Sequence, residues 1–507
     1  MITDLKINAE RKRFYYGKGY GTEKSIGDVW ADRIASHPER TYVTDDQGSS
    51  YTYGEVDDRA GRLAAWLIEE GIEPGDVVTF QLPIWAEFCI VYVACLKCGA
   101  VMHSVPPNFN DEDLVSHMKT VGSRPFNRPT AFHRCDFVKQ AYAVKDRIPT
   151  LASIAFVDKQ APAPEGAPSL SSICAAYEPV TERPAVSSDD VACILSTSGT
   201  TGRPQAVLFT HNNILFSERS FVKGLGRTPD DVMFMPSPLN HATGFYHGLI
   251  SPMILGGRTV LQQHFDAADA LALCNREGVT WSMGATPFVY DILKYPTNEK
   301  LGSFDTLRLF VCGGAPVPGT LVQCAHSHGI LRCEGYGSTE SCPHAFVPPE
   351  RCLEWNGAWS GVPLPGIEVR VVDENHEEVP GGTQGEGSSR GPHQFVGYLN
   401  DKERTDRALD DEGWFYSGDL CYMDEEGRIR INGRKKEIII RGGENICANE
   451  IDENLMECPG IGDPATTGTP DERLGARLRT LPAPPHHRRP ELADTPRQPA
   501  GPHGPNS

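Results

Sequence analysis

The stretch that decides the fold is VACILSTSGTTGRP, residues 191–204, in which an apolar run leads directly into a loop of Ser, Thr and Gly. The apolar part, Val191 to Leu195, predicts a buried strand. Glycine lets the backbone approach a ligand closely, and consecutive N–H groups and hydroxyls can bind phosphate oxygens. The Walker A spacing G-x-x-x-x-G-K-[ST] is absent. The stretch predicts a strand followed by a phosphate loop of another type, although a short isolated match also fits a solvated turn.

Helical and strand-like segments alternate on both sides of this stretch. Residues 26–35 and 56–70 are typical of helices, whereas 41–44, 50–53 and 77–82 are typical of strands. The alternation resumes from residue 191 to 346, and shorter β elements are expected at 368–373 and 428–432. This rhythm predicts an α/β fold with a mainly parallel sheet and helices on both of its faces.

Length, charge and cysteine content narrow the class of protein. A chain of 507 residues predicts at least two domains, and a net charge of -19 argues against nucleic acid or an anionic membrane as a main partner. The 15 cysteines are scattered and odd in number, which favours reduced thiols. Cys95 and Cys98 form a C-x-x-C within an apolar helical run, which favours burial over metal binding. Because no apolar stretch has transmembrane length and the start has no signal-peptide core, we expect a cytoplasmic protein without a membrane span.

Further motifs follow in a fixed order: PLNH from Pro238, GGA from Gly313, GYGSTE from Gly335, YSGD from Tyr416 and GRKKE from Gly433. Together with residues 194–204, this series resembles the adenylate-forming superfamily of acyl-CoA synthetases, aryl-acid AMP ligases, luciferases and peptide-synthetase adenylation domains, over roughly residues 11–477. The stretches HATGFYHG, GATPFVYDIL, GSTESCPHA and GRKKEIIIRGGENI are most similar to short- and medium-chain fatty acid CoA ligases. Alicyclic-acid CoA ligases and dihydroxybenzoate-type ligases are near neighbours.

The resemblance implies a domain organisation. A large N-terminal domain of αβα subdomains plus a β subdomain would span residues 1–432, and a small α+β C-terminal lid domain, here truncated, would span 433–477. Residues 478–507 are rich in Pro, Arg and His and have no hydrophobic periodicity, which predicts a disordered tail. Such a tail fits either a natural extension or out-of-frame translation.

The resemblance also implies cofactors and site residues. ATP, Mg²⁺ and CoA, or a pantetheinylated carrier protein in place of CoA, would bind together with a small carboxylic acid. Glu340 would hold Mg²⁺, Tyr336 would stack on adenine, Asp419 would bind the ribose hydroxyls and Arg434 would contact ribose or phosphate. The full ATP-binding set would be Thr197, Ser198, Gly199, Thr200, Thr201, Gly202, Gln205, Gly313, Gly314, Ala315, Gly335, Tyr336, Gly337, Ser338, Thr339, Asp419 and Arg434.

Smaller sets would serve the chemistry, the thiol and the acid. The catalytic set would be His241, Thr339, Glu340 and Lys436, with Lys436 at the hinge before the lid, and Gly442 and Gly443 would line the thiol tunnel. The acid pocket would comprise His241, Ala242, Phe245, His247, Met283, Gly284, Gly314 and Pro343, although the two histidines also fit satisfied core positions. Because Ala242 stands where dihydroxybenzoate-type ligases have Asn, a hydroxyl on the acid is not required. The acid would be a short or medium fatty acid, which we favour, an alicyclic acid or an aromatic acid such as benzoate.

Two departures from the family pattern affect the expected activity. Gln205 stands where the family usually has Lys, which predicts weaker binding of the outer phosphates. The family's terminal P-x-x-x-x-G-K segment, whose Lys bridges the carboxylate and the α-phosphate, is absent from this sequence. We therefore expect slow adenylation, and two alternatives to a CoA ligase stay open: an enzyme that loads a carrier protein, and a protein that binds nucleotide or acyl-adenylate without turnover.

Overall fold

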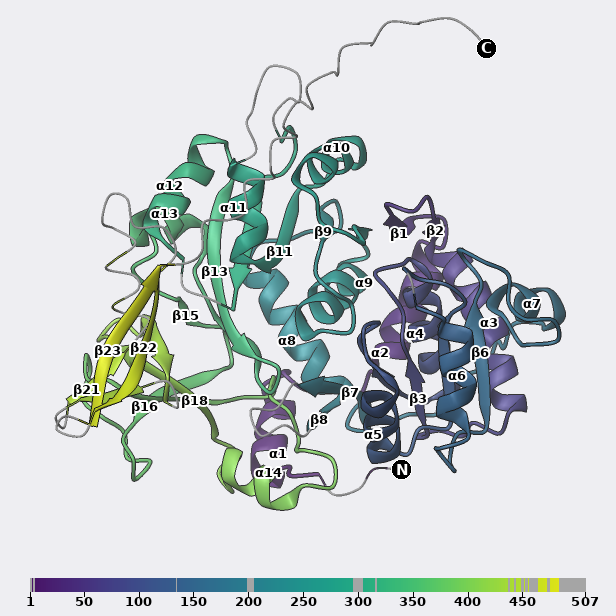
Figure 1. Cartoon of the computed structure of the whole chain (residues 1–507), viewed down its shortest axis with the longest axis horizontal. Helices are drawn as coiled ribbons and strands as arrows, with labels where there is room; N and C mark the ends of the chain where they lie inside the picture. The colour runs from purple at the N-terminus through teal and green to yellow at the C-terminus, as the bar shows by residue number, and fades with distance from the viewer. Residues whose placement is uncertain are drawn as a thin grey trace, which may run out of the picture. The chain divides into compact units, whose positions relative to one another are not determined.

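The computed structural model describes residues 2, 5–133, 135–197, 205–294, 304–314, 317–435, 438–441, 444–447, 451, 455, 464–471 and 475–482. The chain divides into two compact units, Met1–Ile431 and Asn432–Ser507. The first unit has an α/β architecture with two large sheets and one smaller sheet (Figure 1).

The first large sheet has six strands in the order β6-β5-β3-β4-β7-β8, and all neighbours are parallel except β7 and β8. Its strands are β3 (Val77–Phe80), β4 (Val101–Ser104), β5 (Pro125–Pro129), β6 (Ser153–Val157), β7 (Val191–Thr197) and β8 (Gln205–Thr210). The helices of this region are α1 (Ala9–Gly17), α2 (Ile26–Ser36), α3 (Tyr53–Glu69), α4 (Glu87–Cys98), α5 (Asp111–Val121), α6 (Phe137–Lys145) and α7 (Leu170–Ala176).

Both faces of this sheet are covered, as the sequence predicts. In β6, Ala155 and Val157 join the hydrophobic cluster that contains α3 and α4. The alternate residues Ile154 and Phe156 join a second cluster, which contains α5 and α6. This alternation follows from the two-residue period of a strand, and burial on both faces is typical of parallel sheets.

The second large sheet has nine strands in the order β15-β14-β13-β12-β11-β9-β10-β1-β2, with a parallel centre and antiparallel margins. The strands are β1 (Thr41–Asp45), β2 (Ser50–Thr52), β9 (Val232–Met235), β10 (Arg258–Leu261), β11 (Trp281–Ala285), β12 (Leu309–Gly313), β13 (Leu331–Ser338), β14 (Cys342–Phe346) and β15 (Val362–Pro363). The associated helices are α8 (His211–Gly224), the π-helix η1 (Thr243–Ile250), α9 (Ser251–Leu255), α10 (Ala267–Glu277), α11 (Thr286–Lys294), α12 (Gly319–Ser327), the 3₁₀-helix η2 (Pro349–Arg351) and α13 (Cys352–Trp355).

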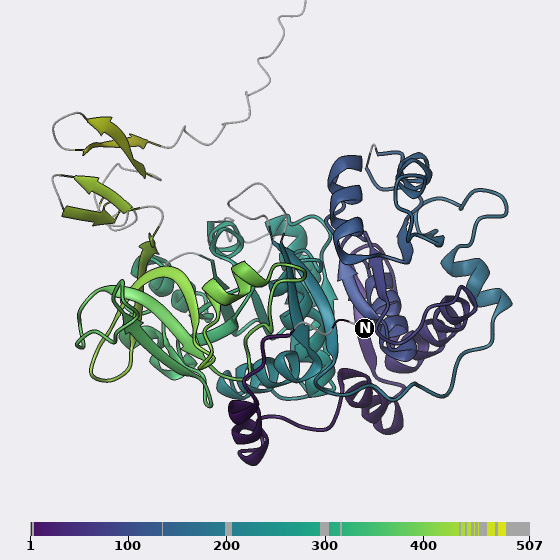
Figure 2. The same cartoon turned by 90° about the horizontal axis from the view of Figure 1, so that it is seen from below.

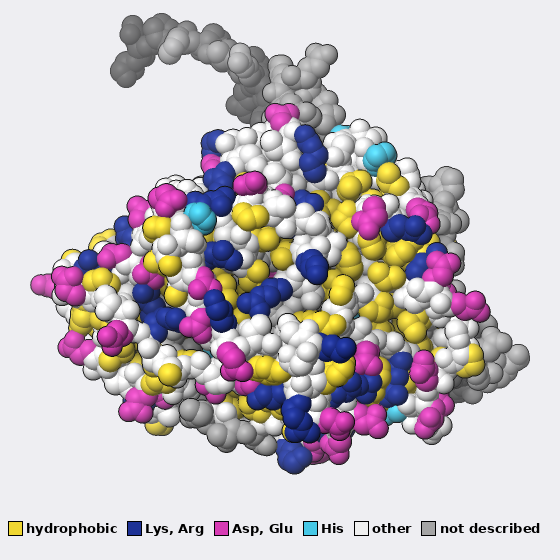
Figure 3. Space-filling model, turned by 180° about the vertical axis from the view of Figure 1, so that it is seen from behind, with side chains coloured by type: hydrophobic (Ala, Val, Ile, Leu, Met, Phe, Trp, Pro, Cys, Tyr) yellow, Lys and Arg dark blue, Asp and Glu magenta, His cyan; other side chains and the backbone are white. Residues whose placement is uncertain are grey.

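A four-stranded antiparallel sheet follows, in the order β16-β17-β18-β19. It consists of β16 (Glu368–Val372), β17 (Gly385–Arg390), β18 (Phe415–Met423) and β19 (Ile429–Arg434), and α14 (Lys402–Ala408) lies between β17 and β18 in the sequence. Figure 2 shows the green strands of this sheet to one side of the teal strands of the nine-stranded sheet. On the face shown in Figure 3, basic side chains lie among acidic ones, so the negative net charge is not gathered into one region there.

The second unit contains two antiparallel hairpins among its described residues. They are β20 (Ile438–Arg441) with β21 (Glu444–Cys447), and β22 (Pro464–Asp471) with β23 (Gly475–Pro482). The predicted start of the tail at residue 478 is five residues too early, because β23 continues to Pro482. Its backbone pairs with β22 up to Pro464↔Pro482, and the Thr466 and Thr480 hydroxyl oxygens lie 2.9 Å apart. Backbone pairing needs no apolar periodicity, which explains why composition alone misses this strand.

Most predicted elements of the first unit are present with shifted ends. The strand predicted at 50–53 ends at Thr52, because Thr52 and Glu55 form a capping box that starts α3 at Tyr53. The Cys-containing run is confirmed as the buried helix α4. Burial raises the pKa of the Cys98 thiol to about 12, which makes this thiol unreactive. No helix within the described residues is long and apolar enough to cross a membrane.

A buried cluster of charges ties the two large sheets together. The Lys159 ammonium, just after β6, lies 2.6 Å from the Asp45 carboxylate at the end of β1 and 2.9 Å from the Glu87 carboxylate at the start of α4. The exposed fractions of these side chains are 11%, 0% and 7%, respectively. Two buried carboxylates without their cation would be strongly unfavourable.

We therefore expect Lys159→Met to lower the free energy of unfolding by about 3–5 kcal/mol, as for other buried pairs that lose one partner. Urea denaturation followed by tryptophan fluorescence would measure the change. Lys24→Met is the matched control, because the Lys24–Asp32 pair is more than half exposed and should contribute under about 1 kcal/mol. Equal effects of the two substitutions would contradict the structural role of Lys159.

Candidate functional site

The carboxyl ends of β9, β11, β12 and β13 meet at one edge of the nine-stranded sheet, where ligands bind in open α/β sheets. Several predicted residues lie there: Met283 and Gly284 at the end of β11, Gly313 and Gly314 at the end of β12, and Gly335 in β13. A Cβ at Gly313 or Gly335 would lie 3.7 or 3.6 Å from the Met283 methyl carbon. Met283 thus packs beside both glycines, and Gly314, with a φ of 84°, faces open space.

The turn between β13 and β14 carries Ser338, Thr339 and Glu340. A Cβ at Gly337 would lie 1.8 Å from the carbonyl oxygen of Cys342, so the two strands approach more closely here than any other residue would permit. Cys342 itself has a φ of 49°, an uncommon conformation for a residue other than glycine. The tight turn fixes the two predicted catalytic residues between Ser338 and Cys342.

Tyr336 and Asp419, which the sequence predicts for adenine and ribose, lie together. The Tyr336 hydroxyl donates a hydrogen bond of 2.8 Å to the Asp419 carboxylate. Asp419 is only 5% exposed, and its backbone N–H donates to the Ser417 hydroxyl at 3.0 Å. Burial, together with the Asp419 charge, raises the pKa of Tyr336 well above its usual range. The hydroxyl therefore remains a donor, and it orients one oxygen of Asp419.

Glu340, the predicted Mg²⁺ ligand, is half-buried, and its Oε1 accepts a 2.9 Å hydrogen bond from the Tyr398 hydroxyl. The sequence analysis does not identify Tyr398, because 58 residues separate it from Glu340 and no local pattern links them. Among the described residues no group of three or more His, Cys, Asp or Glu side chains could form a metal cage. A single carboxylate fits Mg²⁺ that is bound mainly by nucleotide phosphates.

The phosphate loop is bounded by the β7–β8 hairpin. Thr197 pairs with Gln205 in the strand register, and Gln205 is 8% exposed. The predicted residues Ser198, Gly199, Thr200, Thr201 and Gly202 lie outside the described residues, as do Ala315, Lys436, Gly442 and Gly443. Arg434 is exposed and belongs to the second unit.

Two neutral histidines hold the end of β7. The Ser196 hydroxyl lies 3.2 Å from Nε2 of His103 and 3.0 Å from Nδ1 of His117, and Nδ1 of His103 lies 2.9 Å from the Thr79 hydroxyl. Burial lowers the pKa of His103 to about 3 and that of His117 to about 4. Both imidazoles are therefore uncharged at neutral pH, and they fix Ser196 by hydrogen bonds without adding charge.

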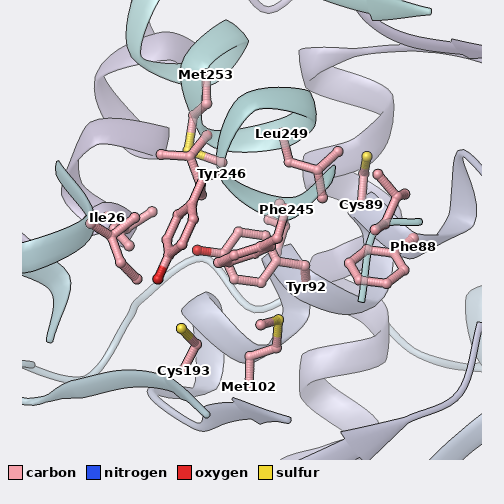
Figure 4. Close-up of a cluster of buried hydrophobic side chains, with 14 of the residues drawn as sticks. Ile26, Phe88, Cys89, Tyr92, Met102, Cys193, Phe245, Tyr246, Leu249 and Met253 are labelled. Carbon is pink, nitrogen blue, oxygen red and sulfur yellow. The ribbon is translucent and has the colours of Figure 1, made fainter. Parts of the chain in front are cut away.

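The predicted acid-binding residues fall into two groups. His241 is exposed in the segment between β9 and η1, and its Nδ1 accepts the Thr243 N–H at 3.3 Å. Ala242 is half-buried, and Pro343 is buried in β14. Phe245, by contrast, is 0% exposed and packs against Tyr92 of α4 with ring centroids 5.0 Å apart, inside the cluster of Figure 4.

His247 belongs to the buried group as well. It is 1% exposed, its Nδ1 lies 3.0 Å from the Glu218 carboxylate, and its ring packs on Phe221 with centroids 4.6 Å apart. The Ser251 hydroxyl donates to the same carboxylate oxygen of Glu218. This geometry favours the core interpretation of His247 that its sequence context leaves open, and it places Phe245 among packing residues rather than at an open surface.

The comparisons with known proteins agree with this arrangement. The AMP-binding enzyme family matches residues 30–399. The medium-chain fatty-acid–CoA ligase of Escherichia coli (strain K12) is 42% identical over 477 residues, which cover 94% of this chain and 84% of that protein. A feruloyl-CoA synthase from an Amycolatopsis species is 30% identical over 452 residues, which cover 89% of this chain and 87% of that protein.

A solved structure shows the same fold. ATP-bound MatB from Rhodopseudomonas palustris superposes with a TM-score of 0.81 at 26% identity, over 90% of this chain and 88% of that one. The family match covers both large sheets. The chain therefore belongs to the AMP-binding enzyme family and, within it, to the acyl-CoA ligases.

Proposed function

We propose that the protein activates a medium-chain fatty acid with ATP and transfers the acyl group to CoA, in the cytoplasm. The observation that carries the proposal is the convergence of Tyr336, Asp419 and the Glu340 turn at the carboxyl edge of the nine-stranded sheet. The choice of acid is supported by the 42% identity to a medium-chain fatty-acid–CoA ligase.

In the first step, a carboxylate oxygen of the acid attacks the α-phosphorus of ATP, and the bond to pyrophosphate breaks. Both reactants are anions, so the site must stabilise negative charge as it develops. Mg²⁺, when bound, would supply positive charge to the phosphates, and Glu340 would hold it. Tyr336 and Asp419 would orient adenine and ribose, Thr339 would contact the α-phosphate, and His241 would lie beside the acid.

In the second step, the CoA thiolate attacks the carbonyl carbon of the adenylate, and AMP leaves. We assign the hinge to Lys436 and the thiol path to Gly442 and Gly443, in line with the motif from Gly433. We propose an N-terminal domain of residues 1–432 and a lid domain that begins at residue 433. The expected end of the lid is residue 477, but the lid's last strand, β23, continues to Pro482. The tail would therefore begin at residue 483.

The acid pocket that we propose is apolar, and it does not require a polar group on the acid besides the carboxylate. Ala242, Met283, Gly284, Gly314 and Pro343 offer small or apolar surfaces without a side-chain hydrogen-bond partner for a ring hydroxyl. An aliphatic chain can fill such a pocket, whereas an aryl acid with a 2-hydroxyl would leave that hydroxyl unsatisfied. Phe245 and His247 would support the pocket from the core behind η1.

A single-turnover assay of the purified chain with Mg²⁺, ATP and single acids tests the proposal. The acids are hexanoate, octanoate, cyclohexanecarboxylate, benzoate and salicylate, and chromatography measures acyl-AMP and pyrophosphate. We expect octanoate and hexanoate to give adenylate at least about 10-fold faster than salicylate, because of the missing hydrogen-bond partner. Adenylate without CoA-dependent turnover would instead favour a carrier-protein acceptor, and ATP binding without adenylate from any acid would contradict the proposal.

A second prediction concerns Gln205. Gln205→Lys would place a cation beside the outer phosphates, and we expect it to lower the KM for ATP roughly 10-fold, which corresponds to about 1–2 kcal/mol for a charge-assisted bond. Gln47→Lys adds the same charge to an exposed turn and should leave the KM unchanged. If both variants shift the KM equally, the effect is one of net charge and Gln205 does not contact phosphate.

A further inference from the structure

Glu340 accepts two hydrogen bonds from one short segment, residues 395–398. The Phe395 N–H donates to the Glu340 carbonyl oxygen at 2.7 Å, and the Tyr398 hydroxyl donates to Oε1 of the Glu340 carboxylate at 2.9 Å. The first contact fixes the backbone of the β13–β14 turn. The second fixes the rotation of the carboxylate, because a hydrogen bond to an ionised acceptor is short, directional and comparatively strong.

Burial, a backbone hydrogen bond and a cation–π contact fix the position of Tyr398. It is 7% exposed, its N–H donates to the Thr405 hydroxyl at 2.9 Å, and the Arg404 guanidinium lies over its ring at 5.0 Å from the centroid. The ring therefore presents a fixed donor to Glu340.

The backbone of the same segment pairs with β8. Leu208 donates to the Gly397 carbonyl at 3.0 Å, Val396 donates to the Leu208 carbonyl at 2.9 Å, and Leu399 donates to the Ala206 carbonyl at 2.9 Å. Ala206 directly follows Gln205, at one end of the phosphate hairpin. The segment thus connects the hairpin of the six-stranded sheet to the turn of the nine-stranded sheet that carries Glu340.

We propose that Tyr398 is a positioning residue for magnesium-dependent adenylation. It fixes the rotation of the Glu340 carboxylate, which would hold Mg²⁺, and the segment that carries it fixes the separation between that carboxylate and β8. The inference rests on the proposed function, in which Glu340 holds Mg²⁺. Tyr398 touches neither the nucleotide nor the acid in this role, and it acts only through Glu340.

The test compares Tyr398→Phe, which removes only the hydroxyl, with the unaltered chain. Two quantities are measured: the Mg²⁺ concentration that gives half-maximal pyrophosphate release, and the Kd for ATP by calorimetry, with Mg²⁺ and with EDTA. We expect the half-maximal Mg²⁺ concentration and the Kd for MgATP to rise about 10-fold, as for loss of a hydrogen bond to a charged group. The Kd in EDTA and the KM for the acid should not change.

Tyr42→Phe is the matched control. The Tyr42 hydroxyl donates to the Leu249 carbonyl at 2.9 Å within the core, so its loss should lower stability without changing the dependence on Mg²⁺. In a Glu340→Gln background, Tyr398→Phe should have no further effect, because the carboxylate through which it acts is gone.

Additive effects of Tyr398→Phe and Glu340→Gln, or a shift no larger than that of Tyr42→Phe, would overturn the inference. The calorimetric measurement distinguishes failure of the inference about Tyr398 from failure of the proposed function. An unaltered chain that binds MgATP but releases no pyrophosphate would refute the function alone, and the comparison of Kd values would still decide the role of Tyr398. Binding of ATP that is no tighter with Mg²⁺ than with EDTA would overturn the inference.

Discussion

The pairing of residues 396–399 with β8, combined with the hydrogen bond from Tyr398 to Glu340, is the contact on which the site depends most. The phosphate hairpin belongs to the six-stranded sheet, whereas the Glu340 turn belongs to the nine-stranded sheet. Two sheets that met only through apolar side chains could slide by small amounts, because hydrophobic burial is non-directional. Hydrogen bonds have preferred distances and angles, so this segment defines the separation of the two parts. The Lys159 cluster adds a second polar connection between the same sheets.

The electrostatics of the site follow from the need to bind polyphosphate in a chain of net charge -19. Buried groups beside the predicted nucleotide positions are kept neutral or are used as donors. His103 and His117 hold Ser196 as uncharged imidazoles, because burial lowers their pKa values to about 3 and about 4. Tyr336 and Tyr398 donate to carboxylates and keep their protons. Neutral donors of this kind position the carboxylates without adding negative charge, and under the proposed function the positive charge near the phosphates would come from Mg²⁺ and from side chains that contact the nucleotide.

The sequence is sufficient to predict what depends on local patterns. The α/β class and the helix α4 follow from periodicity, and the motifs that contain Gly313, Gly335 and Gly418 lie on β12, β13 and β18. It is insufficient for contacts between distant segments. Tyr398 and Glu340 are 58 residues apart, and His103 lies 93 residues from Ser196. The end of β23 is missed for a related reason, since its pairing with β22 is made by the backbone and leaves no apolar pattern in the sequence. The start of α3 was available from the spacing of Thr52 and Glu55.

The π-helix η1 shows why residues adjacent in a motif need not share a role. Within HATGFYHG, His241 is exposed at the sheet edge, whereas Phe245 and His247 are buried. Gly244 permits this change, because a Cβ there would lie 2.1 Å from the Pro238 carbonyl oxygen, and a Cβ at Gly248 would lie 2.7 Å from Cγ of Met235. The helix is thereby pressed onto β9, and its large side chains enter the core shared with α4 (Figure 4). Wide helical turns of this type recur at functional sites. Here the buried part of the motif fixes the position of His241 and Ala242. If these two residues contact the acid as we propose, specificity for the acid depends on how firmly η1 is packed as well as on the residues that line the pocket.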